Sequence, residues 1–190
     1  MKSKLIIALF FFTINFYPQH TTRFLKLTKN LHSVDSIVIK EKHKNGNLKR
    51  TVIILNYIVN NKDYKFYSGF HRVYLKNGNL LWEIKHDPYG NRLYYREMNL
   101  DGNLSKEIIT TLIDTSSENL SDFLSDNRKL IIETHEKKYW LSKEKKPFLR
   151  KEVTKRNGKK TGIWKKYNYY GDIIKTKDFS KRSKLITTKN

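Results

Sequence analysis

The chain has 190 residues, with 39 Lys+Arg against 18 Asp+Glu, which gives a formal net charge of +21. Hydrophobic residues make up 38% of the sequence and aromatic residues 13%, which is enough to form a core and excludes a wholly disordered chain. The absence of cysteine excludes disulfides, thiolate metal sites, a cysteine nucleophile and a cysteine-linked lipid anchor. No apolar run reaches the roughly 18 residues that a membrane-spanning helix needs.

The N-terminus has the features of an export signal. Met1–Lys4 carries two lysines, Leu5–Phe12 is an apolar run, and Pro18 ends any helix that begins in it. No Ala-x-Ala cleavage motif follows. We expect residues 1–20 to be a signal peptide, with a mature chain that begins between Gln19 and Thr22 in the periplasm or outside the cell. The alternative is a buried N-terminal strand or helix of a cytoplasmic protein.

Glycine-containing turns follow at regular intervals. Asn-Gly and Asp-Gly pairs predict type I′ hairpin turns, in which both central residues need positive φ angles. The four pairs are Asn45–Gly46, Asn77–Gly78, Asp101–Gly102 and Asn157–Gly158. A type I turn is predicted at Asp87–Gly90. Gly78, Gly90 and Gly102 are 12 residues apart, a spacing that leaves strands of about eight residues and predicts a β-meander.

The segments between the turns read as strands. Val52–Val59 is apolar at odd and even positions alike, which predicts the most buried strand. Leu80, Trp82 and Ile84 alternate with Leu81, Glu83 and Lys85, as in a strand with one exposed face. Strand residues begin again at 129–134. The predicted fold is therefore mainly β: an antiparallel meander of hairpin repeats in a single twisted sheet.

One short helix interrupts the series, near residues 116–127, with Ser116 or Ser117 as its N-cap. The repeat domain is expected to span residues 21–180. Residues 181–190 are expected to be a flexible basic tail.

Two segments of the chain align with each other, near residues 69–104 and 158–179. Each has a glycine, a tyrosine five residues later, a turn glycine four residues after that, and an aliphatic residue two further on. Such self-similarity is typical of repeat proteins. The predicted framework comprises Gly69, Tyr74, Gly78 and Leu80 in the first copy, and Gly162, Trp164, Tyr167, Gly171 and Ile173 in the second.

The second copy matches the pattern Gly-x-Trp-x-x-Tyr-x-x-x-Gly-x-aliphatic and resembles the MORN-repeat variant family, whose bacterial members include YwqK-type antitoxin-like proteins. The first copy has His71 where tryptophan is usual, and residues 104–155 are unlike the family. The resemblance implies a non-catalytic binding module with a protein partner, such as a toxin that it neutralises.

The positive charge is concentrated near the C-terminus. From residue 143 to 190 there are 17 basic and 4 acidic residues, a net +13. One interpretation is compositional, because 30 of the 39 basic residues are lysine. The other is an acidic partner, bound by a face that bears Lys165, Lys166 and Lys175, with Trp82 as a further candidate contact. An acidic protein surface is the first expectation; the alternatives are an anionic envelope lipid or polysaccharide or, without export, nucleic acid.

Catalytic patterns are scarce. The histidines show no paired metal-ligand spacing, and neither a nucleophile elbow nor a phosphate-binding glycine loop occurs. His86 and Asp87 are adjacent, but Asp87 is already explained as a turn residue. His71 and Glu83 lie on the two strands of the Asn77–Gly78 hairpin, where a nuclease-like pair is the alternative to a structural role. Overall we predict no catalytic residue, no cofactor and no metal.

Overall fold

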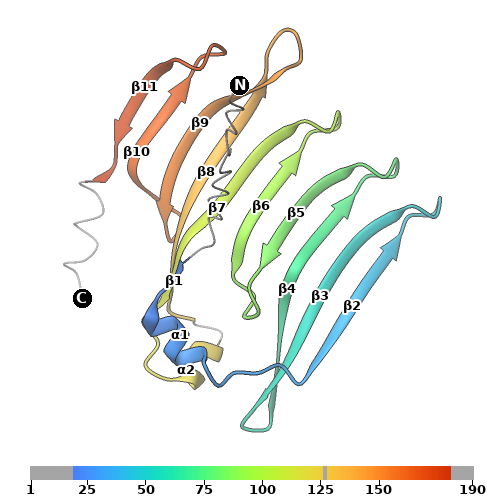
Figure 1. Ribbon diagram of the computed structural model, residues 1–190, viewed down its shortest axis with the longest axis vertical. Coiled ribbons are helices and arrows are strands. Elements are labelled where there is room, and N and C mark those ends of the chain that lie inside the picture. The colour runs from blue at the N-terminus through green and yellow to red at the C-terminus, as the bar shows by residue number, and fades with distance from the viewer. Residues whose placement is uncertain (1–18, 126–127, 181–190) are drawn as a thin grey trace, which may run out of the picture.

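The computed structural model describes residues 19–125 and 128–180 (Figure 1). The segment 1–18, which carries the predicted export signal, and the predicted tail 181–190 lie outside the described residues. Ten antiparallel strands form one open sheet in which each strand pairs with its neighbours along the chain. The predicted β-meander is thereby confirmed.

The meander runs from β2 at one edge to β11 at the other. Its strands are β2 (Asp35–Lys42), β3 (Leu48–Val59), β4 (Lys62–Tyr74), β5 (Leu80–His86), β6 (Arg92–Met98), β7 (Leu104–Thr115), β8 (Leu130–Leu141), β9 (Pro147–Arg156), β10 (Lys159–Tyr167) and β11 (Ile173–Asp178). The short β1 (Gln19–His20) pairs in parallel with β7 at Leu112 and Ile113. It reaches β7 there because β6 pairs with β7 only as far as Ile109.

Most hairpins share a three-residue loop. Between β4 and β5, the Leu75 amide donates to the Asn79 carbonyl at 2.8 Å and the Gly78 amide donates to the Leu75 carbonyl at 2.9 Å. Gly78 has a φ of 89°, whereas Asn77 is not among the residues with positive φ. The type I′ prediction is therefore wrong at Asn77, and for the same reason at Asn45 and Asp101. Each of these loops is one residue longer than a type I′ loop, so only its last residue needs a left-handed conformation.

Two turns do contain two successive residues with positive φ. Asn157 and Gly158, with φ of 47° and 78°, match the type I′ prediction. Asn60 and Asn61, at 52° and 59°, join β3 to β4 without any glycine. The predicted turn at Asp87–Gly90 is confirmed by a 3.2 Å bond from the Gly90 amide to the Asp87 carbonyl.

The two aligned copies have the same local geometry. Gly69 and Gly162 have φ of 60° and 61° inside β4 and β10, each beside a shift in strand register. Tyr74 lies opposite Leu80 across its hairpin, and Tyr167 lies opposite Ile173. In both pairs the shift immediately precedes the tyrosine. The repeat pattern seen in the sequence thus corresponds to one structural unit that occurs twice.

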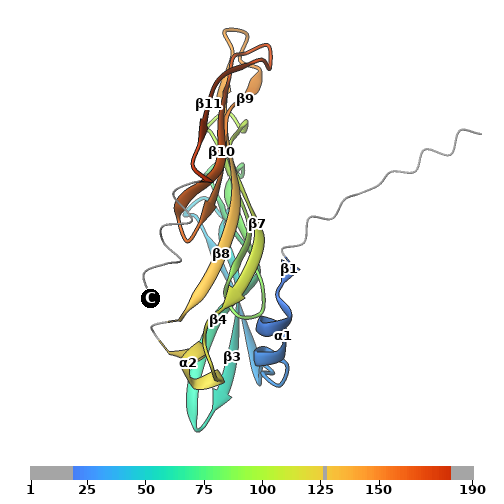
Figure 2. The ribbon, with the colours of Figure 1, turned by 90° about the vertical axis from the view of Figure 1, so that its left-hand side faces the viewer.

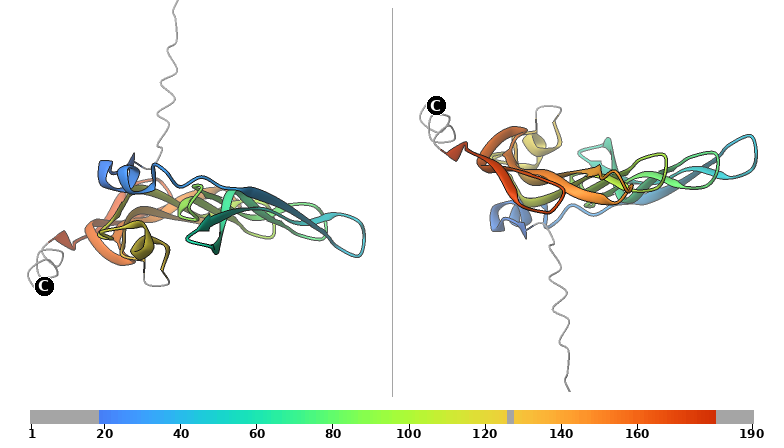
Figure 3. Two further views of the ribbon diagram at one scale, coloured as in Figure 1. Left: turned by 90° about the horizontal axis from the view of Figure 1, so that it is seen from below. Right: turned by 90° about the horizontal axis from the view of Figure 1, so that it is seen from above.

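Two helices lie on opposite faces of the sheet, α1 (Thr22–Thr28) and α2 (Leu120–Leu124) (Figures 2 and 3). Helix α2 falls within the predicted range, but its N-cap is Asn119, whose side chain accepts from the Asp122 amide at 2.9 Å. The serines proposed as caps come too early in the chain. Helix α1 was not predicted, because its sequence was assigned to the region around the expected cleavage site.

The two helices meet beyond the turn of the short β5–β6 hairpin. The rings of Phe24 and Phe123 pack edge to face with centroids 5.5 Å apart, and Tyr89 from the turn lies 5.6 Å from Phe24. The Tyr57 hydroxyl donates to the Pro88 carbonyl at 2.8 Å. The fully enclosed members of this cluster are Phe24, Leu31, Tyr57, Ile113, Phe123 and Leu124. The main core therefore lies at one end of the sheet.

Within residues 19–125 and 128–180, no second layer covers the sheet. In β3, which was predicted to be the most buried strand, only Val52 and Tyr57 are buried, and Ile58 is 52% exposed. The prediction was wrong because it assumed that both faces of the strand were covered. The apolar side chains of β3 instead lie on a sheet open on both sides over most of its area.

The N-terminal segment is fixed to the sheet by polar contacts. His20 Nε2 lies 2.8 Å from Asp87 Oδ2, and the carboxyl of Asp87 is almost fully buried. The Arg23 guanidinium pairs with Asp114 at 2.6 Å. Gln19 and His20 therefore belong to the sheet, and the predicted end of the signal peptide at residue 20 stays a prediction.

Replacing Gly78 with valine tests the loop geometry. A β-branched residue at a φ near 90° is strained, so Gly78→Val should lower the free energy of unfolding by about 1 kcal/mol or more. No atom lies within 4 Å of the added Cβ, so a loss would come from the backbone alone. Asn79→Val, at an exposed position in the same loop, is the control. Equal denaturation midpoints for the two variants would show that the loop was assigned wrongly.

Candidate functional site

Strand register decides which charged side chains meet. Directly opposed residues of antiparallel strands lie on the same face of a sheet, with Cβ atoms about 4.5–5.5 Å apart. Following these partners from strand to strand traces rows of side chains across the sheet. Two of these rows run through neighbouring positions of the same strands, one on each face, and they differ in the arrangement of their charges.

On the first face, charges of opposite sign alternate. The row is Arg72, Glu83, Arg96, Glu107, Lys137, Glu152 and Lys165, from β4 to β10. Glu83 lies 2.8 Å from both Arg72 and Arg96 and is only 5% exposed. Lys137 pairs with Glu107 at 3.7 Å and Lys165 with Glu152 at 3.3 Å. We call this surface the ion-pair face, because its row neutralises itself.

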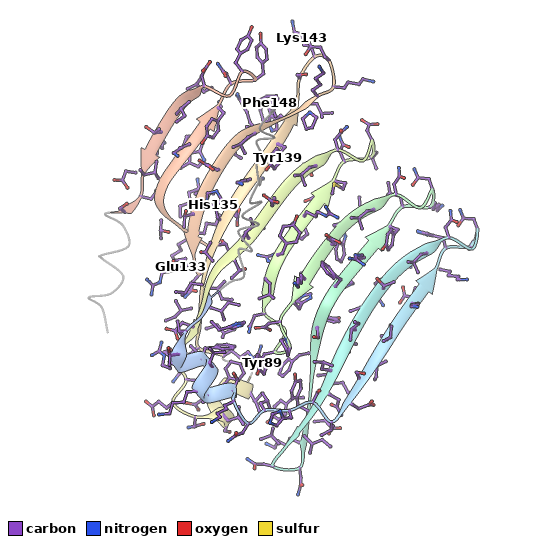
Figure 4. The ribbon with its side chains drawn as sticks, viewed as in Figure 1. Tyr89, Glu133, His135, Tyr139, Lys143 and Phe148 are labelled. Carbon is purple, nitrogen blue, oxygen red and sulfur yellow. The ribbon has the colours of Figure 1, made fainter. Side chains whose placement is uncertain are left out.

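Glu152 is the most connected carboxylate of the ion-pair face. It accepts from the Tyr167 hydroxyl and lies 3.1 Å from His135. Figure 4 labels His135 on β8. Burial raises the pKa of the Glu152 carboxyl, but hydrogen bonds from Tyr167, Lys165 and His135 outweigh burial and lower it. Burial and the same bond raise the pKa of Tyr167 to about 12. The framework tyrosine of the second copy thus joins β10 to β9.

On the opposite face, the corresponding row consists of lysines. Lys106, Lys138, Lys151, Lys166 and Lys175 are directly opposed in succession from β7 to β11, the strands coloured yellow-green to red in Figure 1. These five residues are the lysine row, and the surface that carries them is the lysine face. The same row continues from Lys106 to Glu97 and then to Trp82 on β5.

Acidic side chains also lie on the lysine face, since Glu97 is directly opposite Lys106 and Glu136 pairs with Lys155 at 2.8 Å. None of the five lysines forms an ion pair with a residue of the described ranges 19–125 and 128–180. Burial and then the neighbouring charges, chiefly Lys138, Lys160, Lys155 and Lys166, lower the pKa of Lys151. Like charges directly opposite each other destabilise a sheet. An anionic partner bound to the row would therefore reduce the repulsion between its lysines.

The predicted partner-binding residues fall on both faces. Lys166, Lys175 and Trp82 share the lysine face, and Trp164, opposite Lys177, lies there too. Lys165 lies on the ion-pair face against Glu152, so the expectation that it shares a face with Lys166 is corrected. Adjacent residues of a strand point to opposite faces, which is the reason for the difference.

Sequence reasoning missed Lys106, Lys138 and Lys151. They lie on three different strands and in three different stretches of the chain, and no short motif connects them. The signal that identifies them is the register of the hairpins, which the sequence did not supply.

Near Trp82 the lysine face carries an aromatic cluster. The His71 ring packs edge to face on Trp82 with centroids 4.9 Å apart, and Tyr67 lies within 6 Å of both His71 and His86. Burial lowers the pKa of His71, and burial followed by the charge of His71 lowers that of His86 to about 4. Both histidines are therefore neutral at pH 7 and add no charge to the lysine row.

The two acid–base pairs considered from sequence do not form. His71 lies opposite Ile84, on the other face from Glu83, which is held by two arginines. Asp87 pairs with His20 instead of His86, and it accepts from the Tyr89 and Asn91 amides at 2.9 and 2.8 Å. These residues stabilise the fold in this arrangement.

Other features of the described chain offer little chemistry. A hollow of about 330 Å³ lies between the β8–β9 and β10–β11 turns, lined by Leu141, Ser142, Lys143, Glu144, Phe148 and Tyr169. Within residues 19–125 and 128–180, no group of three or more histidine or acidic side chains is placed to hold a metal. No helix of this part of the chain is long and apolar enough to cross a membrane.

Compared with family models, curated proteins and solved structures, the chain matches none of them. The resemblance to MORN repeats stays a prediction. The candidate site rests on the register and electrostatics described above.

Reversing the central charge of the lysine row tests whether the row is under electrostatic strain. Lys151→Glu places a carboxylate between Lys138 and Lys166, so it should raise the free energy of unfolding by roughly 0.5–1 kcal/mol at low salt. Added salt should shrink the difference. Lys165→Glu, on the ion-pair face, should instead destabilise, because it faces Glu152. Thermal melts at two salt concentrations measure both variants, and a Lys151→Glu protein no more stable than wild type would contradict the interpretation.

Proposed function

We propose that this protein is an exported, non-catalytic binding module that binds an acidic partner through the lysine row. The observation that carries the proposal is the difference between the two faces. On the ion-pair face the row of charges is neutralised strand by strand. On the opposite face five lysines are directly opposed in succession, and the row meets a carboxylate at its β6 end, where Glu97 is opposite Lys106.

This segregation argues against a purely compositional origin of the charge. Carboxylates lie beside lysines on both faces, because Glu97 is opposite Lys106 and Glu136 pairs with Lys155 on the lysine face. Within the row from Lys106 to Lys175, however, lysine opposes lysine at every step, whereas Glu107 and Glu152 alternate with basic residues on the ion-pair face. A one-sided array of this kind attracts anions over a distance and makes binding sensitive to salt.

A protein partner is the class that the MORN resemblance implies, in the manner of an antitoxin or immunity protein that neutralises a toxin. The shared geometry of the two repeat copies supports that resemblance. An anionic lipid or polysaccharide of the envelope is the alternative, and nucleic acid would apply to a protein that is not exported. A non-catalytic role is supported by the contacts of Glu83 with Arg72 and of Asp87 with His20, which hold both carboxylates in structural ion pairs.

Matched triple variants test the proposed function. Replacing Lys138, Lys151 and Lys166 with glutamine removes three charges from the lysine row. Replacing Lys40, Lys137 and Lys165 with glutamine removes the same number from the opposite face. With immobilised poly-L-glutamate as the acidic probe, the first triple variant should bind at least about tenfold more weakly at low salt, mainly through slower association. Circular dichroism checks that both variants fold.

Comparable losses in the two triple variants would show that net charge alone controls binding, and would overturn the assignment to the lysine row.

Export has its own test. Since His20 is paired with the buried Asp87, we expect processing to remove no more than the first 18 residues, so that the mature chain keeps Gln19 and His20. The intact mass of the protein from the periplasmic or extracellular fraction of its native host measures this. A full-length chain in the cytoplasm would contradict export, and a chain that begins after His20 would contradict the role of β1.

A further inference from the structure

We propose that the occupant of the lysine row is a linear anionic polysaccharide that lies across the strands, along the line from Lys106 to Lys175. This inference rests on the proposed function, since it names the class of acidic partner that the lysine row binds. Three features support it: the extended shape of the row, the lack of aromatic residues and arginine between Lys106 and Lys175 in the row, and the cations that contact aromatic rings beside it.

The shape of the row favours an extended ligand. Each of five consecutive strands contributes one lysine, and neighbouring strands are about 4.8 Å apart, so the row spans about 19 Å at a nearly regular interval. Lys138 and Lys175 are exposed, and Lys106, Lys151 and Lys166 are partly buried. A ligand that offers one negative charge per repeating unit can contact successive lysines simultaneously. A compact ligand with one or two charges contacts only part of the line.

The residues of the row do not suit a folded protein. The buried centres of protein interfaces are depleted in lysine and depend on a few aromatic or arginine residues that fill pockets. From Lys106 to Lys175 every directly opposed position is lysine, and the row reaches an aromatic side chain only at Trp82, beyond Glu97. Lysine is a flexible, strongly hydrated point charge, which suits contacts that are electrostatic and regularly repeated.

The aromatic rings near the row do not form a platform for nucleobases. Binding of single strands depends on aromatic faces that are open for stacking. The charged groups of Lys106 and Arg92 lie over the Tyr95 ring, 5.6 and 5.9 Å from its centroid. Trp140 carries Arg150 at 4.5 Å. Cations of the chain itself thus contact Tyr95 and Trp140. Trp164 lies on the same face two residues before Lys166, so single-stranded DNA is one of the competing probes in the test below.

Oligogalacturonates of graded length provide the test, because they carry one carboxylate per sugar and differ only in length. By calorimetry at low salt, wild-type protein should bind an octamer at least about tenfold more tightly than a dimer, since only the longer chain contacts all five lysines. Lys175→Gln, at the end of the row, should weaken the octamer and leave the dimer almost unchanged. Lys151→Gln, at its centre, should weaken both. Lys165→Gln, with the same charge change on the ion-pair face, is the control.

Several results would overturn the inference. These are equal affinity for dimer and octamer, an octamer insensitive to Lys151→Gln, and tighter binding of poly-L-glutamate, single-stranded DNA or anionic phospholipid vesicles at equal charge concentration. If the triple variant of the lysine row still binds poly-L-glutamate as wild type does, the proposed function itself fails. If that variant loses binding but length has no effect, the proposed function stands and only the polysaccharide is excluded.

Discussion

The rest of the structure depends on one geometric constraint, the alternation of side chains along strands that are paired in sequence order. Because directly opposed residues share a face, a residue on one strand fixes which face its partners occupy on every other strand. Ten strands in one meander therefore turn separate stretches of sequence into continuous rows. A shift of one residue in any hairpin would exchange the ion-pair row and the lysine row beyond that point.

A single-layer sheet must be stabilised without a conventional core, and the chain does this in two ways. At one end, α1 and α2 pack from opposite faces beyond the β5–β6 turn, where Phe24, Phe123 and Tyr89 meet and Arg128 donates to the Tyr89 carbonyl at 2.9 Å. Over the open area, alternating ion pairs such as those of Glu83 join neighbouring strands. On the lysine face the Lys155–Glu136 pair also joins neighbouring strands, but the lysine row is repulsive.

This difference connects stability with function. Electrostatic strain that is retained on a folded surface is relieved when a ligand of opposite charge binds, so the same lysines that weaken the free sheet strengthen the complex. The ion-pair face supplies the rigid side of the arrangement, since Glu152 and Glu107 tie β7–β10 together directly beneath the row. A line of positive charge supported from the other face is well suited to an extended anionic ligand.

The sequence by itself determined the meander, the positions of most turns and the presence of α2. These features are predictable because their causes are local. Glycine and asparagine favour a positive φ angle at their own positions, and the alternation of apolar and polar residues describes a single strand. The similarity of the segments that contain Tyr74 and Tyr167 was visible in the sequence because it is also a local pattern. Local signals did not distinguish a type I′ loop from a loop one residue longer, because both place glycine at a positive φ after a polar residue.

Only the tertiary structure decided which side chains share a face. Lys165 and Lys166 are adjacent in sequence and lie on opposite sides of the sheet, whereas Lys106 and Lys175 are 69 residues apart and lie in one row. The burial of β3 and the partner of Asp87 were likewise decided at long range. The net charge of a segment follows from its composition alone. Which charged side chains lie together depends on strand register, and register depends on every hairpin between the residues concerned.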